Sequence, residues 1–166
     1  MAIQHNLPRT LIVCYSLEGT TLQLAQAMAT AVGADIHQIQ PQKSIPKQGF
    51  GKYFLGGMQA IFRSTPALIP DSVDPSVYEL VIIGGPTWGR HMASPLRSWL
   101  SKASLRGQEV AIFCSCRGDA GGTLQDMRQM LTQARVIGEN TFTLNARQDN
   151  LAQLKRDAVS WARQLN

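Results

Sequence analysis

The chain has 166 residues, with 16 Lys and Arg against 11 Asp and Glu, which gives a formal net charge of +5. Hydrophobic residues make up 44% of it. This composition excludes a disordered chain, a collagen-like repeat and a coiled coil. The length suits one domain, and because the sequence has no repeat, linker or low-complexity tract, we expect residues 1–166 to form a single domain.

The predicted elements alternate between strands and helices along the chain. An apolar strand at 11–15 is followed by a helix at 20–32, which Gly33 stops, and by a weaker strand at 34–39. Beyond a long connection, 41–70, the order is an apolar strand at 80–83, a helix at 95–103 capped by Ser94, an apolar strand at 110–114, a helix at 123–134, a weaker strand at 136–144 and a helix at 150–165.

This alternation predicts an α/β fold with a parallel sheet covered by helices on both faces. The three apolar strands suit the interior of the sheet, and the two weaker ones suit its edges. Together with right-handed crossovers, this gives a three-layer, doubly wound, five-stranded sheet with strand order 2-1-3-4-5.

The connection 41–70 carries four cations and no acid, and so contributes +4 of the net charge of +5. Its cations are Lys43, Lys47, Lys52 and Arg63. Aromatic and aliphatic residues at helical spacing predict a helix over about 50–63. The simple interpretation is a helix packed on the sheet with solvated lysines around it. The alternative is a basic rim for an acidic partner or for the phosphate of NAD(P)H.

Three loops that are rich in glycine and polar residues follow the three inner strands, at 16–21, 84–95 and 115–122. In a doubly wound sheet, ligands bind beyond the carboxyl ends of the strands, where the strand order reverses. We therefore expect these loops to meet in one site.

The loop 16–21 runs directly into the first predicted helix. The free N–H groups of the helix favour an anion, and the hydroxyls of Ser16, Thr20 and Thr21 can add donors, so the loop predicts a phosphate site. Neither the lysine-bearing P-loop motif nor the Rossmann glycine motif is present. The alternative is that the Ser, Thr and Gly residues of this loop only cap the helix.

The loop 84–95 adds an aromatic side chain to the expected site, and the loop 115–122 adds glycines. Trp88 could cover a flat aromatic ligand, or it could simply pack beneath its loop. The glycines of 115–122 let the backbone come close to a ligand, although a flexible surface loop would have the same composition.

Taken together, the three loops resemble those of the flavodoxin-like FMN-binding family. Cys14-Tyr-Ser-Leu-Glu-Gly-Thr-Thr21 is similar to the FMN phosphate loop of a bacterial subgroup with the pattern Y-S-L-E-G-x-T. Gly85-Pro-Thr-Trp-Gly89 resembles a flavin loop, and residues 113–122 resemble the second, glycine-rich flavin loop. The similarity spans essentially the whole chain.

The resemblance implies FMN as the cofactor, and it implies that each loop binds a different part of FMN. The first loop, on the phosphate, supplies Ser16, Leu17, Glu18, Gly19, Thr20 and Thr21. The second, on the isoalloxazine ring, supplies Pro86, Thr87, Trp88 and Gly89. The third, on the other side of the ring, supplies Ser115, Cys116, Arg117, Gly118 and Gly121.

Two features depart from the family pattern. Many flavodoxins have Thr at the position of Glu18, and a carboxylate about 5 Å from a phosphate charge is repelled by about 3 kcal/mol at an effective dielectric of about 20. We therefore expect Glu18 to point outward. Electron-carrier flavodoxins are also usually acidic, whereas this chain is basic, which argues against their usual docking on basic partners.

The resemblance implies electron transfer, with a redox protein or NAD(P)H as partner and a monomer or homodimer as the assembly. The alternatives are an NAD(P)H-dependent quinone or FMN reductase, in which Arg90 and His91 could meet an anionic substrate, and a flavin-free regulatory module. No catalytic side chain is required, because the flavin supplies the chemistry.

The sequence also predicts where the protein resides. Its start has no basic stretch followed by a long apolar core, and an odd count of three cysteines fits a reducing compartment. We therefore expect a cytoplasmic protein with no membrane partner. Because only the pI near 9.5 points to nucleic acid, we expect no such partner either.

Overall fold

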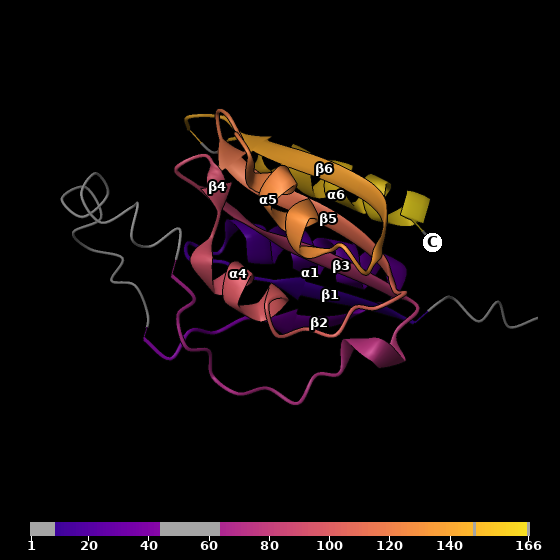
Figure 1. Ribbon diagram of the computed structural model, residues 1–166. Coiled ribbons are helices and arrows are strands. Elements are labelled where there is room, and N and C mark those ends of the chain that lie inside the picture. Colours follow the sequence, from indigo (N-terminus) through magenta and orange to yellow (C-terminus); the bar gives the residue numbers. More distant parts are fainter. Residues whose placement is uncertain (1–8, 44–63, 148, 166) are drawn as a thin grey trace, which may run out of the picture.

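The computed structural model describes residues 9–43, 64–147 and 149–165, and these form a twisted sheet with helices on both sides (Figure 1). Its parallel strands are β1 (Thr10–Cys14), β2 (Asp35–Gln38), β3 (Leu80–Trp88), β5 (Glu109–Arg117) and β6 (Arg135–Leu144). The short strand β4 (His91–Met92) pairs antiparallel with β3.

The order of the parallel strands is β2-β1-β3-β5-β6. Counted without β4, this is the predicted order 2-1-3-4-5, and the predicted doubly wound α/β fold is confirmed. The inner strands are the apolar ones, since all five residues of β1 are buried, whereas β2 and most of β6 are half-buried or exposed.

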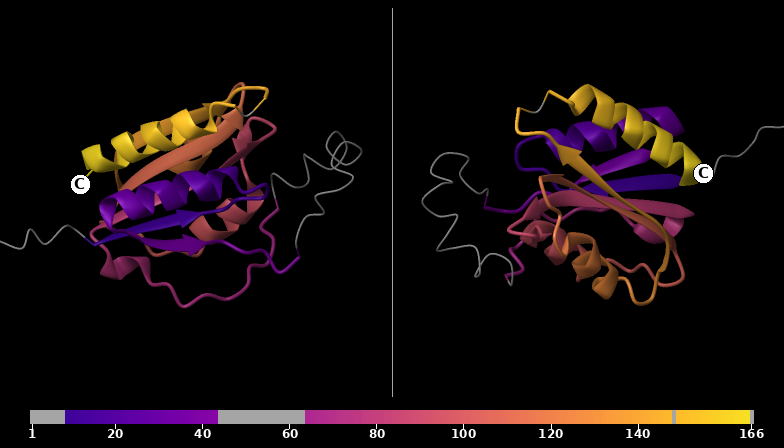
Figure 2. Two further views of the ribbon diagram at one scale, coloured as in Figure 1. Left: turned by 180° about the vertical axis from the view of Figure 1, so that it is seen from behind. Right: turned by 90° about the horizontal axis from the view of Figure 1, so that it is seen from above.

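Helices cover the sheet on both faces. They are α1 (Thr20–Val32), α4 (Ser94–Leu100), α5 (Thr123–Met130) and α6 (Leu151–Leu165), with a 3-10 turn η1 at Pro75–Val77. Seen from above, in the right-hand view of Figure 2, α1 and α6 lie on one side of the sheet and α4 and α5 on the other. None of the helices in this described part is long and apolar enough to cross a membrane.

Alternating residues of the strands supply two separate cores. Val81 and Ile83 of β3 face the α4 side, whereas Ile82 faces the α1 and α6 side. On the latter side the Phe113 ring packs edge-to-face against Phe142 and Trp161, with centroids 5.9 and 6.2 Å away.

The prediction of a loop over 84–95 is wrong in its first half. β3 continues to Trp88, and a two-residue turn at Gly89 and Arg90 leads into β4. Their φ angles of +52° and +69° give a turn with both central residues left-handed, as type I′ hairpins require. In the same way, β5 continues through Ser115 to Arg117, into the predicted third loop.

Two helices end earlier than the sequence predicted, α4 at Leu100 and α5 at Met130. Ser94 is the first residue of α4, not its cap; Ala93 takes the cap position. The predicted helix 50–63 lies outside the described residues, as do three of the four cations of 41–70.

Candidate functional site

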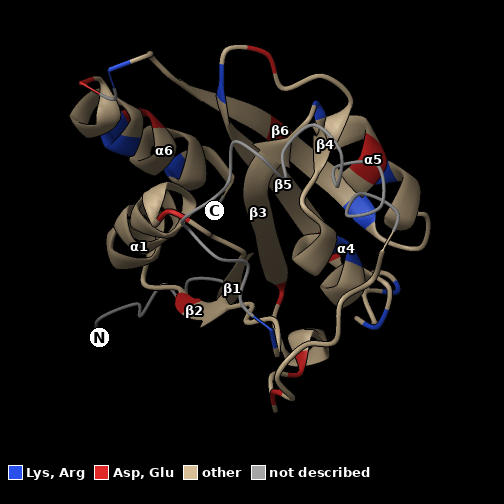
Figure 3. Ribbon diagram, turned by 90° about the vertical axis from the view of Figure 1, so that its left-hand side faces the viewer, with Lys and Arg blue, Asp and Glu red and all other residues tan. Residues whose placement is uncertain are grey.

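A pocket of about 690 Å3 opens at the carboxyl ends of β1, β3 and β5. This is the edge of the sheet at which the strand order reverses. Strand β4, which pairs with the end of β3, lies on the side of the molecule that faces the viewer in Figure 3. The predicted residues that line it are Ser16, Leu17, Glu18, Thr20, Thr21, Pro86, Thr87, Trp88, Gly89, Ser115, Cys116 and Arg117. Gly19, Gly118 and Gly121 are not among its lining residues.

The amino terminus of α1 forms one wall of this pocket. Gly19 is its N-cap, and among the described residues no side chain caps the helix. The Gly19 N–H instead donates to Ser16 Oγ at 3.1 Å, within the loop itself. The capping alternative therefore holds for Gly19 and not for the hydroxyls, and within the described ranges the first-turn N–H groups of the helix have no side-chain acceptor.

A buried pair of hydroxyls joins α1 to β5. Thr21 Oγ1 and Ser115 Oγ lie 2.7 Å apart, and the two residues are only 2% and 4% exposed. One hydroxyl donates to the other, so the accepting one keeps a proton to donate elsewhere. Since both residues line the pocket, this pair can supply one donor to a bound anion or sugar.

A second link, between β5 and the loop before α1, lies at the rim. Arg117 Nη2 donates to Glu18 Oε2 at 3.0 Å, and both side chains are more than half exposed. Glu18 is therefore exposed at the rim, but it also lines the pocket, so only the exposure agrees with the expectation that it points outward. It is also tied to a cation that is 99 residues away along the chain.

Trp88 is largely part of the core. It is 8% exposed and packs edge-to-face with Tyr15, with ring centroids 5.4 Å apart. Burial raises the pKa of the Tyr15 hydroxyl to about 12. Only a small part of Trp88 can therefore reach the pocket, as wall rather than as a cover.

The tip of the β3–β4 hairpin docks on the loop after β5. Gly122 N–H donates to the Arg90 carbonyl at 2.8 Å, and the Arg90 guanidinium pairs with Asp119. A Cβ at Gly121 would lie 2.3 Å from Arg90 Cβ, so this glycine is where the hairpin backbone packs. The contact fixes the wall formed by Thr87 to Arg90.

The docking should weaken in acid. The Gly121 N–H, and then the Arg90 guanidinium, lower the pKa of Asp119 below its ordinary 3.8. A depressed carboxyl pKa stabilises the folded loop at pH values above 3.8, and this contribution is lost as pH falls through the depressed value. We expect Asp119→Asn to remove this part of the acid sensitivity, measured as the pH-dependence of amide exchange at Gly121 and Gly122. An unchanged acid profile would show that Asp119 does not hold the loop.

The sequence matches the profile of the family described as Flavodoxin over residues 9–155. The chain belongs to the flavodoxin family. A search of curated proteins finds no match.

Solved structures agree on the flavodoxin fold. A candidate flavoprotein from Bacteroides uniformis is similar with a TM-score of 0.77 and 17% identity, over 94% of this chain and 98% of that one. A flavoprotein from Lactobacillus acidophilus in complex with FMN has a TM-score of 0.70 and 22% identity, over 81% and 93%. General stress protein 14 of Treponema denticola, also in complex with FMN, has a TM-score of 0.56 and 14% identity, over 96% and 100%.

Three pocket residues of this flavodoxin were not among the predicted FMN-binding residues, although Arg90 was named as a possible contact for an anionic substrate. Arg90 and Asp119 lie at the docked hairpin, and Leu144 lies at the carboxyl end of β6. Leu144 could have been found from topology, because the carboxyl ends of parallel strands share one edge of the sheet. The pairing of Arg90 with Asp119 depends on the hairpin, which the sequence did not reveal.

The cysteines are buried and free. Cys114 and Cys116 face the same side of β5, and each sulfur lies 3.5 Å from a threonine hydroxyl of β6. Burial raises the pKa of the Cys114 thiol, so it stays protonated near neutral pH. In the described ranges, no group of His, Cys, Asp and Glu could hold a metal ion.

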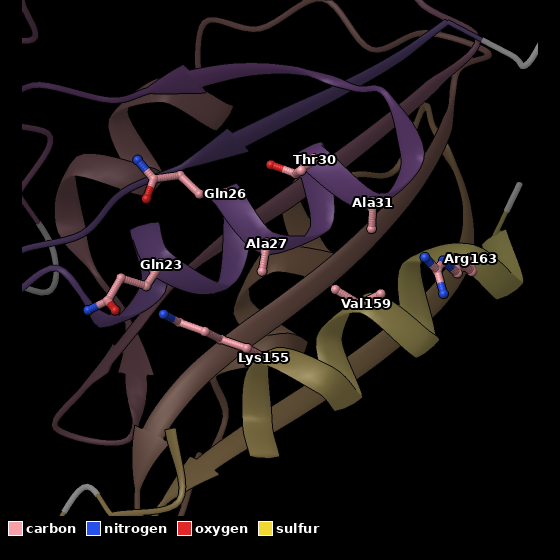
Figure 4. A pocket seen from close by; sticks show the side chains of 8 residues that line it. All are labelled: Gln23, Gln26, Ala27, Thr30, Ala31, Lys155, Val159 and Arg163. Carbon is pink, nitrogen blue, oxygen red and sulfur yellow. The ribbon is translucent and has the colours of Figure 1, made fainter. Parts of the chain in front are cut away.

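A second hollow, of about 630 Å3, lies between α1 and α6, and Figure 4 shows its lining side chains. They are Gln23, Gln26, Ala27, Thr30, Ala31, Lys155, Val159 and Arg163. This groove is formed by the sides of two helices and does not include the carboxyl ends of the strands. The pocket at the strand ends is therefore the better candidate, because three separate loops converge on it.

Proposed function

We propose that this flavodoxin binds FMN in the strand-end pocket and acts in electron transfer. The observation that carries the proposal is the uncapped start of α1 beside the buried Thr21–Ser115 hydroxyls, with the β3–β4 hairpin opposite. Phosphate groups bind at helix amino termini of this kind. The FMN complexes among the similar structures add support.

The residues present fit FMN in size and charge. The pocket volume of about 690 Å3 lies within the range of roughly 300–1,000 Å3 that small-molecule and cofactor sites occupy. Its charged lining residues form two opposite pairs, Glu18 with Arg117 and Asp119 with Arg90. Neither sign of charge is therefore in excess in the lining.

Each of the three loops would contribute differently to FMN binding. Ser16, Thr20 and Thr21 with the first N–H groups of α1 would hold the phosphate, and Pro86 to Gly89 would flank the ring. Ser115 to Arg117 would close the opposite side, and Gly121 would act by positioning the hairpin. When bound, FMN supplies one- and two-electron redox chemistry, so the protein's part is to bind and orient it.

The test is the absorbance of the purified protein and titration of the stripped protein with FMN. We expect flavin bands in the visible spectrum and saturable, one-to-one binding. A protein with neither property would be the flavin-free module of the same fold, and the proposal would be wrong.

A stand-alone NAD(P)H-dependent quinone or FMN reductase is the second candidate. It is favoured by the exposed Arg90 at the pocket rim, which an anionic nucleotide could meet if it displaced Asp119 from the guanidinium. Steady-state oxidation of NADH or NADPH with a quinone acceptor separates the two functions. A carrier turns over only when a partner reductase is added, whereas a reductase turns over alone.

A further inference from the structure

We propose that Arg117 makes this pocket selective for a flavin that bears a phosphate, by neutralising the carboxylate of Glu18. The inference rests on the proposed binding of FMN. It assigns a specificity role to a residue at the end of β5, which contacts the loop predicted to hold the phosphate.

The register of β5 places Arg117 along the phosphate loop. Ser115 and Arg117 are two residues apart on one strand, so their side chains leave the same face of the sheet. Ser115 meets Thr21, in the first turn of α1, at 2.7 Å. Arg117, one step further out, meets Glu18 in the loop before α1 at 3.0 Å.

Glu18 is poorly placed for a protein that binds an anion. It directly precedes Gly19, the N-cap of α1, and it lines the same pocket as Ser16 and Thr20. Unpaired, its negative charge would offset the positive potential that the helix amino terminus offers to a bound anion. The guanidinium at 3.0 Å cancels that charge and leaves the helix terminus and the hydroxyls to attract an anion.

The ion pair of Glu18 and Arg117 contributes little to the stability of the fold. Arg117 is 51% exposed and Glu18 is 59% exposed, and exposed ion pairs contribute little to stability. The other charged pair of the lining, Arg90 with Asp119, is internally neutral and belongs to the hairpin. Changes at Glu18 and Arg117 should therefore alter the local potential and leave the chain folded.

The experiment compares FMN with riboflavin, which lacks the phosphate, as ligands of the stripped protein. In Arg117→Gln we expect the dissociation constant of FMN to rise about tenfold, while that of riboflavin changes less than about twofold. In Glu18→Gln we expect FMN to bind severalfold more tightly, because Arg117 is then unopposed. The double variant should return to within about threefold of wild type.

A matched control removes a cation elsewhere. Lys155 lies in the α1–α6 groove of Figure 4, so Lys155→Gln changes the net charge by the same amount away from the pocket. We expect it to leave the FMN-to-riboflavin ratio of affinities unchanged. The selective loss in Arg117→Gln should also shrink as salt is raised from about 50 mM to 500 mM, since screening weakens exposed charges.

The outcomes separate this inference from the proposed function. If wild type binds neither flavin, both are wrong. If wild type binds FMN but Arg117→Gln weakens both flavins equally, or neither, then the inference alone is wrong. A selective loss of FMN in Glu18→Gln would also overturn it, because Glu18 would then assist phosphate binding.

Discussion

Gly84→Ala is expected to lower the free energy of unfolding by about 3 kcal/mol, because the added methyl group has no room. A Cβ at this position would lie 2.1 Å from two atoms of the Phe113 ring. Gly84 and Phe113 are register partners on β3 and β5, so the ring lies directly beside the glycine. Phe113 is fully buried against Phe142 and Trp161 and has nowhere to move.

The neighbouring residue is the matched control. A Cβ at Gly85 would lie 2.8 Å from Leu96 Cδ2, which is the end of a flexible side chain. Gly85→Ala should therefore cost about 1 kcal/mol. For a chain of this length, 1 kcal/mol shifts the melting temperature by roughly 2–4 °C, so the two variants should be separable by thermal denaturation. Equal losses would show that the Phe113 ring is not what requires Gly84.

These two glycines explain why the length of β3 could not be predicted from the sequence. A Gly-Gly-Pro stretch is typical of a loop, and the prediction ended the strand at residue 83. In the structure Phe113 and Leu96 fill the space where side chains of Gly84 and Gly85 would be. Those contacts come from β5 and α4, and local sequence does not contain them.

The β3–β4 hairpin could not be predicted from the sequence for a related reason. Type I′ turns usually carry Asn-Gly or Gly-Gly, and here the pair is Gly89-Arg90. A left-handed arginine costs about 1 kcal/mol. The structure offsets this through the Gly122 N–H on the Arg90 carbonyl and through the ion pair with Asp119, contacts some 30 residues away.

The features of the fold that depend on hydrophobic periodicity and on strand order could be predicted from the sequence. The apolar runs placed β1, β3 and β5 inside the sheet, and the order brought their three following loops to one edge. The contacts within that edge could not be predicted, because Glu18 and Arg117 are 99 residues apart and nothing local to either one indicates its partner.

Gly121→Ala is expected to raise the dissociation constant of FMN at least tenfold, or about 1.4 kcal/mol, although Gly121 does not line the pocket. Its φ of +55° already disfavours alanine. Its Cβ would also lie 2.3 Å from Arg90 Cβ and 2.6 Å from the Arg90 carbonyl oxygen. The hairpin must then move off the loop, and Thr87 to Arg90 move with it.

Gly122→Ala is the control for this prediction, because its Cβ would meet nothing closer than the Arg90 carbonyl oxygen at 3.8 Å. Its φ of −89° also suits alanine, so FMN binding should change less than about twofold. Both variants should unfold within about 2 kcal/mol of wild type, since the altered contact is at the surface. A Gly121→Ala protein that binds FMN like wild type would show that the docked hairpin is not what shapes the pocket. A loss of stability as large as that of Gly84→Ala would show that the hairpin belongs to the core.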